Sequence, residues 1–163
     1  MAAGGRIFYV ARPFGAPMGG IATLFRHVEI LVSRGFDAAI YLLPGEGELF
    51  VRHHAPIVDA RQPVEPHPDD IFVLPEAWVA HLPAILALPA RKYVFCQNHF
   101  YIFAGLGGAP SYAALGIEGV FASSGIIAHF LRCDLGVADV SVIPYAIDTT
   151  LFRPRSKRRQ IAF

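Results

Sequence analysis

Short runs of β-branched and aromatic residues alternate with segments of helical periodicity along most of this chain. The first such unit has an apolar run at residues 6–12, apolar residues at helical spacing over 21–32, and a second apolar run at 38–43. A strand, a helix and a strand in this order join parallel strands of one sheet. The chain is therefore constrained from its start toward a parallel α/β architecture.

The same alternation continues to residue 144. Further strands are predicted at 55–58, 71–75, 92–96, 120–122 and 140–144, the first of these being short. Helices are predicted at 78–88, distorted by Pro83, and from 126, with Ser123 or Ser124 as its N-cap and Gly136 beyond its end. Residues 105–110 are predicted to form a glycine-rich loop. About six strands with interleaved helices predict a single doubly wound, mostly parallel Rossmann-like sheet.

Composition narrows the class of protein. With 54% hydrophobic residues, 17% charged residues and a net charge of +1, the 163-residue chain offers no broad surface for nucleic acid. No apolar stretch reaches the ~20 residues of a spanning helix, so no transmembrane segment and a cytoplasmic location are expected. Cys96 and Cys133 lie in apolar runs and are expected to be buried, reduced thiols.

Ligands of open α/β sheets bind outside the carboxyl ends of the strands, so the loops there are the candidate sites. Gly19 and Gly20 lie between the first strand and the first helix. Glycines allow a ligand close to the backbone, and a helix N-terminus offers free N–H groups to a phosphate or a carboxylate. The dinucleotide and P-loop fingerprints are absent. A turn built of small residues is the equally weighted alternative.

Polar side chains also follow the strands at 71–75 and 92–96. Gln97, Asn98 and His99 come directly after the second of these, where amide and imidazole groups suit hydrogen bonds to sugar hydroxyls. Glu76 follows the first and is predicted to face the same cleft. An ordinary loop and a carboxylate at a helix start are the respective alternatives.

A short acidic stretch, His-Pro-Asp-Asp at residues 67–70, resembles the metal-binding stretch of zinc-dependent sugar deacetylases. Here it precedes a strand, and no His-x-x-His partner follows it. We therefore predict a turn leading into the strand at Ile71 and no metal site. No nucleophile elbow is present either, so no catalytic residue is assigned within this chain.

Four segments together resemble the N-terminal domain of GT-B-fold retaining glycosyltransferases, most closely family 4. They are RIFYVARPFGAPMGGIATLFRHVEILVSRGFDAAIYL, YVFCQNHFY, GVFASSGIIAHFL and VIPYAIDTTLFRP. The last is the most specific, because it is similar to the pattern V-I-P-N-G-I-D-x-x-x-F-x-P that closes this domain. The chain departs from the pattern at Tyr145 and Ala146, which stand where the family has Asn-Gly.

The resemblance implies a function for the complete enzyme: transfer of a sugar from a nucleotide-sugar to a hydroxyl acceptor, with retention. The nucleotide-sugar is a substrate, so no cofactor and no essential metal are implied. Gly19 and Gly20 would lie against the donor phosphates. His99 is the first candidate for contact with the sugar, and Asn98 the second. The acceptor is left open among a sugar, a lipid-linked molecule and another small molecule.

The resemblance also implies a division of the chain. Residues 1–152 are expected to form the acceptor-side domain, and 153–163 the linker and the start of a missing C-terminal donor-binding domain. The hinge would include Asp148, Phe152 and Pro154, and residues 161–163 would be an orphan strand. The chain alone would then be inactive, with an interdomain face open to self-association, and peripheral contact with the inner membrane is left open.

Two other functions are consistent with the same residues. The first is a stand-alone, non-catalytic module that binds a glycan or a protein partner through that face. The second is a sugar-nucleotide epimerase of the same two-domain fold.

Overall fold

The computed structural model describes residues 5–62, 64–145, 147, 149 and 152–154. Its centre is one seven-stranded sheet with the order β3-β2-β1-β4-β5-β6-β7, in which every pair of neighbouring strands is parallel. The strands are β1 (Ile7–Ala11), β2 (Ala38–Leu42), β3 (Ile57–Asp59), β4 (Ile71–Pro75), β5 (Arg91–Cys96), β6 (Gly119–Ala122) and β7 (Val140–Val142). The predicted Rossmann-like class is confirmed, and the sheet is parallel throughout.

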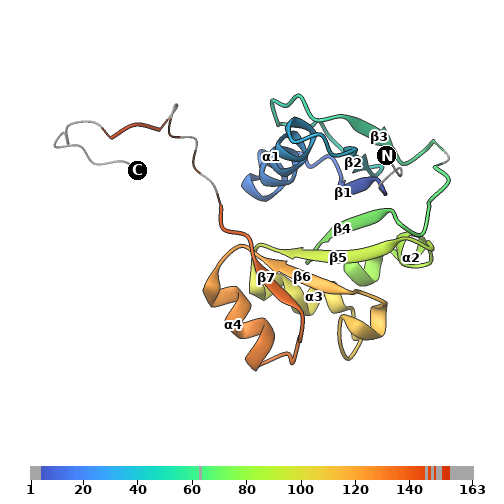
Figure 1. The fold of residues 1–163 in the computed structure, drawn as a ribbon, viewed down its shortest axis with the longest axis vertical. Helices are drawn as coiled ribbons and strands as arrows, with labels where there is room; N and C mark the ends of the chain where they lie inside the picture. Colours follow the sequence, from blue (N-terminus) through green and yellow to red (C-terminus); the bar gives the residue numbers. More distant parts are fainter. Residues whose placement is uncertain (1–4, 63, 146, 148, 150–151, 155–163) are drawn as a thin grey trace.

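Helices cover both faces of this sheet, as a doubly wound fold requires (Figure 1). Helix α1 (Gly19–Ser33) packs on one face through Ile21, Leu24, Phe25 and Val28. The opposite face carries α2 (Pro83–Leu86), α3 (Ile102–Leu106), α4 (Gly125–Cys133) and the single turns η1 (Val79–His81), η2 (His99–Tyr101) and η3 (Ala113–Leu115). The two hydrophobic cores therefore lie on opposite sides of the strands.

Strand residues alternate between these two cores, as the period of two in a strand dictates. In β1, Phe8 and Val10 face the α2–α4 core, whereas Tyr9 and Ala11 face α1. Because both faces of the central strands are buried, their sequences are continuously apolar. The mean hydropathy of +0.44 follows from this two-sided burial.

The helix ends follow the predicted signals. The Oγ of Ser124 accepts a hydrogen bond from the Ile127 N–H at 3.3 Å, so Ser124 is the N-cap of α4. Gly35 and Gly136 lie just beyond α1 and α4 with φ of 84° and 64°. At these angles a side chain would be strained, which explains glycine at both helix ends.

Three local predictions need correction. The helix expected at 78–88 is divided into η1 and α2, because Pro83 cannot continue the preceding turn and instead starts α2. Gly105 lies inside α3 rather than in a loop, and its Cα packs against the Glu76 carbonyl, where a Cβ would come within 1.6 Å of the oxygen. Cys96 is buried as expected, but Cys133 is exposed at the end of α4.

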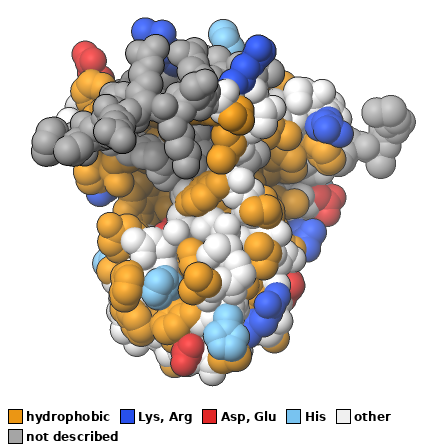
Figure 2. All heavy atoms as spheres, turned by 90° about the vertical axis from the view of Figure 1, so that its left-hand side faces the viewer, with side chains coloured by type: hydrophobic (Ala, Val, Ile, Leu, Met, Phe, Trp, Pro, Cys, Tyr) orange, Lys and Arg blue, Asp and Glu red, His pale blue; other side chains and the backbone are white. Residues whose placement is uncertain are grey.

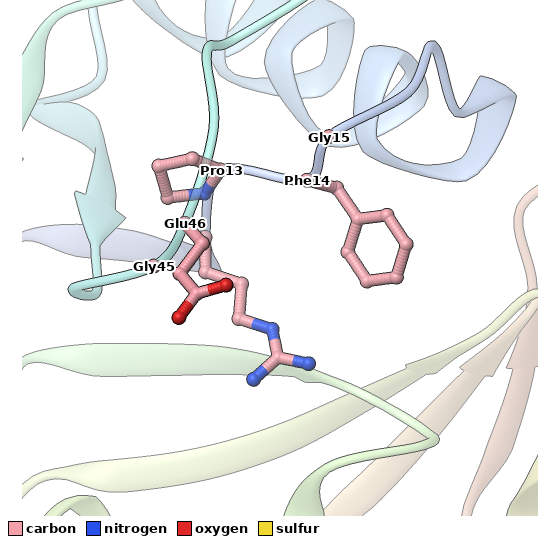
Figure 3. A pocket seen from close by; sticks show the side chains of 6 residues that line it. Pro13, Phe14, Gly15, Gly45 and Glu46 are labelled. Atoms are coloured by element: carbon pink, nitrogen blue, oxygen red, sulfur yellow. The ribbon is translucent and has the colours of Figure 1, made fainter.

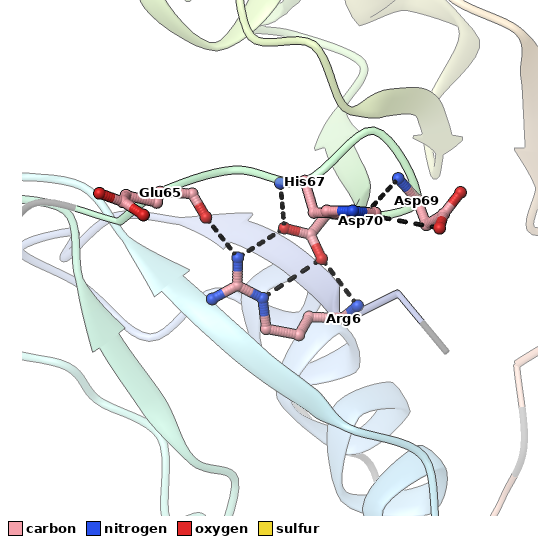
Figure 4. A network of polar contacts seen from close by, with 5 residues as sticks. All are labelled: Arg6, Glu65, His67, Asp69 and Asp70. Carbon is pink, nitrogen blue, oxygen red and sulfur yellow. Dashed lines mark hydrogen bonds and ion pairs between the residues drawn. The ribbon is translucent and has the colours of Figure 1, made fainter. Parts of the chain in front are cut away.

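Residues 67–70 form the predicted turn before β4, and their acidic side chains have a structural role (Figure 4). The Asp70 carboxylate is 1% exposed and pairs with the Arg6 guanidinium at 2.6 Å. It also accepts the backbone N–H groups of Arg6 and His67, both at 2.9 Å. Asp70 thus joins the start of β1 to the turn that leads into β4.

Two further predictions concern the membrane and the hinge. Within the described ranges, no helix is long and apolar enough to cross a membrane. Phe152 and Pro154 of the predicted hinge are exposed. Asp148 and residues 155–163, including the expected strand at 161–163, lie outside the described residues.

Candidate functional site

A cavity of about 480 Å³ opens where the strand order reverses, at the carboxyl ends of β1, β4 and β5. Loops after these three strands and the first turn of α1 form its walls. The lining residues are Arg12, Phe14, Met18, Gly20, Ile21, Leu24, Pro75, Glu76, Ala77, Trp78, Gln97, Asn98, Tyr101 and Tyr145. In open α/β sheets this switch point is the usual ligand site, because adjacent loops there diverge to opposite faces.

Glu76 is the buried carboxylate of this cavity, with 4% of the residue exposed. One carboxylate oxygen, Oε1, accepts the N–H groups of Gln97 at 3.1 Å and Asn98 at 2.7 Å. Burial raises the pKa of Glu76 above its ordinary value, and these backbone hydrogen bonds only partly oppose it. Glu76 therefore holds the loop after β5 against the end of β4.

Gln97 connects three parts of the cavity wall. Its side-chain amide donates to the Gly20 carbonyl at 3.2 Å, and its Oε1 accepts the Tyr145 hydroxyl at 3.0 Å. A Cβ on Gly20 would lie 3.3 Å from the Gln97 amide nitrogen, which is tighter than an ordinary contact. Glycine at position 20 thus allows the Gln97 side chain to lie close to the start of α1.

The structure brings four of the six predicted binding residues together. Gly20, Glu76, Gln97 and Asn98 line the cavity, and the Asn98 side chain also caps η2 by accepting the Phe100 N–H at 3.0 Å. Gly19 and His99 are not among the described lining residues. The His99 ring packs against those of Phe100 and Phe130, with centroids 4.2 and 5.3 Å apart.

Ten of the fourteen lining residues are not among the predicted binding residues, and three of these ten have contacts that matter for the site. Arg12 and Trp78 follow β1 and β4, and the Arg12 guanidinium lies 4.8 Å from the Trp78 ring centroid. Position in the sequence could have indicated both, since Arg12 directly follows β1 and Trp78 lies three residues after β4, on the ligand side of the sheet. Tyr145 was noted only as a departure from a family pattern, and its contact with Gln97 spans 48 residues.

A second cavity, of about 410 Å³, adjoins the first and shares Arg12 and Phe14 with it. Its other lining residues are Pro13, Gly15, Gly45 and Glu46. Figure 3 shows the Phe14 ring and the Glu46 carboxylate reaching into this region from the loops after β1 and β2. Arg12 and Phe14 line both cavities, and we refer to the two neighbouring cavities together as the recess.

The chemistry available here is hydrogen bonding and stacking. The recess combines amide, hydroxyl and guanidinium groups with four aromatic rings, from Phe14, Trp78, Tyr101 and Tyr145. Among the described residues, no group of three or more His, Cys, Asp and Glu side chains is arranged to hold a metal ion. The lining therefore suits a polar ligand with a ring that can pack on aromatic faces.

Comparison with known proteins gives no family for this chain, so the interpretation of the site depends on its geometry. No protein-family model matches the chain, and no curated protein matches it.

Proposed function

We propose that this domain is the acceptor-side half of a nucleotide-sugar-dependent glycosyltransferase that acts with retention. The observation that carries the proposal is the recess at the switch point, with Gly20, Glu76, Gln97 and Asn98 on one wall. The sequence predicts these four residues as binding residues, and they converge on one cavity. Amide groups beside aromatic rings are typical of sugar-binding sites.

Exposed apolar side chains beside the recess support a partner domain or protein on this side of the sheet. Phe100, Phe103 and Ile126 are 70%, 60% and 78% exposed, and Tyr101 is 53% exposed. Figure 2 views the side on which the strands end, and hydrophobic side chains gather over the lower part of it. A contiguous apolar surface of this kind marks an interaction site. In a two-domain transferase the second domain faces this side.

The proposal is tested first on the complete gene product. Transfer of a labelled sugar from a panel of nucleotide-sugars to sugar and lipid-linked acceptors is the assay, with the anomeric configuration of the product read by NMR. Retention of configuration supports the proposal. Conversion of the nucleotide-sugar without transfer would instead identify an epimerase.

The second test uses the 163-residue chain alone. We expect it to bind acceptor sugars and show no turnover, since the resemblance places most donor contacts in the other domain. Turnover by this chain with any nucleotide-sugar would refute the division of labour. Glycan binding without any transferase activity of the complete gene product would favour the non-catalytic module, which the exposed apolar surface also fits.

A further inference from the structure

Arg12 lines both cavities and has no carboxylate partner among the residues that the structure describes. Of the nine arginines among the described residues, Arg6, Arg26, Arg61 and Arg91 each pair with an acidic side chain within 4 Å, and Arg12 is one of the five that do not. No acidic side chain described here lies that close to Arg12, not even Glu46 in the adjoining cavity. An arginine at a ligand-facing strand end with no internal partner has its charge available to a ligand.

Aromatic rings hold this guanidinium in place. Its central carbon lies 4.8 Å from the Trp78 ring centroid and 5.8 Å from that of Phe14. Stacking occupies the faces of a guanidinium and leaves the N–H groups at its edge free to donate. Because these contacts restrict the side chain, binding of a ligand that accepts these donors costs less conformational entropy.

The start of helix α1 also favours negative charge near Arg12, whereas the Glu46 carboxylate, which lines the smaller cavity with Arg12, opposes it. Helix α1 begins at this recess with no acidic residue in its first turn and no side chain capping its N–H groups. Glu76, the acid that lines the larger cavity, directs Oε1 at the backbone N–H groups of Gln97 and Asn98. Arg12 and the positive end of α1 therefore act in the same direction on a bound anion.

We propose that Arg12 binds a negatively charged group of the acceptor, a carboxylate or a phosphate, through the edge of its guanidinium. The acceptor ring then packs on the aromatic rim formed by Phe14 and Trp78. This inference rests on the proposed function, because it assigns the recess to the acceptor. It narrows the acceptor from any sugar to an acidic or phosphorylated one.

The experiment is an NMR titration of the 163-residue chain with glucose, glucuronate and glucose 6-phosphate, each without a donor. The chain is expected to bind at least one charged sugar roughly tenfold more tightly than glucose, since charge-assisted hydrogen bonds are stronger than neutral ones. The two charged probes distinguish carboxylate from phosphate. Arg12→Gln is expected to remove the preference, so that the three probes bind with similar affinity, and Arg12→Lys is expected to recover only part of it.

Arg26→Gln is the matched control, because Arg26 is an exposed arginine of α1 that pairs with Glu29 away from the recess. It is expected to bind all three probes as the unmodified chain does. Equal binding of all three probes by the unmodified chain would overturn the inference, as would a charge preference that survives Arg12→Gln.

A titration with UDP separates the acceptor from the donor. If Arg12→Gln weakens UDP binding as much as charged-sugar binding, the cation serves donor phosphates and the inference is wrong. Failure of the proposed function has a different signature. In that case the complete gene product transfers no sugar, while the charged-sugar preference of the chain and its loss in Arg12→Gln persist.

Discussion

Replacement of Glu76 tests how the floor of the recess is held together. Its Oε1 accepts two backbone N–H groups, from Gln97 and Asn98, while burial raises the pKa of the carboxyl group. Glu76→Gln keeps an acceptor oxygen in the same place and removes the buried charge. Glu76→Ala removes the acceptor itself.

Relative to the unmodified chain, Glu76→Ala is expected to be less stable and Glu76→Gln at least as stable. An unsatisfied buried N–H costs about 1–3 kcal/mol, so Glu76→Ala, which leaves two of them, is expected to lose ~2–6 kcal/mol of unfolding free energy. Glu76→Gln is expected to be at least as stable as the unmodified chain at pH 7, because the native state disfavours the charged form of Glu76.

The pH dependence follows from the raised pKa. Below the ordinary glutamate pKa, Glu76 is protonated in both the folded and the unfolded chain and has no linkage effect. As the pH rises through that value the unfolded chain ionises first, so Glu76 progressively destabilises the native state until the pH exceeds its native pKa. The stability advantage of Glu76→Gln should therefore grow as the pH rises above the ordinary glutamate pKa and level off once the pH exceeds the native pKa.

Urea unfolding followed by circular dichroism at a series of pH values is the assay. If the difference in unfolding free energy between Glu76→Gln and the unmodified chain stays constant with pH, the reasoning about burial is refuted. A Glu76→Ala variant as stable as Glu76→Gln would refute the assignment of Glu76 as the acceptor for the loop after β5.

Two further predictions use the same binding and unfolding measurements. Gly20→Ala is expected to displace the Gln97 side chain and to weaken glucose binding roughly fivefold, from the loss of about 1 kcal/mol of hydrogen bonding. Gly19→Ala, whose Cβ meets nothing within 4 Å, should bind glucose normally, and equal binding by both variants would contradict this prediction. Asp70→Ala is expected to lose ~2–4 kcal/mol of unfolding free energy, because it breaks the ion pair between the buried Asp70 and the partly exposed Arg6. An unfolding free energy within about 1 kcal/mol of that of the unmodified chain would contradict this prediction.

Stability in acid adds a check on the Asp70 network. Burial acts to raise the pKa of Asp70, but the hydrogen bonds from the Arg6 guanidinium and from the His67 and Arg6 N–H groups together lower it below its ordinary value. The stabilisation is therefore complete above the ordinary aspartate pKa and is lost as the pH falls through the native pKa. The difference in unfolding free energy between Asp70→Ala and the unmodified chain should therefore become smaller in acid.

Local patterns in the sequence determined the elements and the class of sheet. Apolar runs of strand length, the helical spacing from Ile21 to Val32 and the positions of Gly35 and Gly136 are consequences of neighbouring residues, so they can be read without tertiary contacts. Ser124 as a cap belongs to the same class, since cap and helix are adjacent in the chain. The direction of the strands followed from the helices between them.

Two local features were not predicted from the sequence, the helix at 102–106 and the position of the His99 side chain. Residues 102–106 form α3, although Gly105 disfavours a helix, because only glycine fits against the Glu76 carbonyl there. Asn98 caps η2 and turns the chain so that His99 packs on Phe130 outside the cavity lining. Both outcomes depend on neighbours that are distant in the sequence.

The composition of the candidate site was decided by the tertiary structure. The order of the strands sets β1 beside β4 and β4 beside β5, and this alone places Arg12 on Trp78 and the loop after β5 on Glu76. The sequence indicated which loops end strands, because that information is local. It could not indicate which loops meet, because crossover connections bring together residues that no local pattern relates.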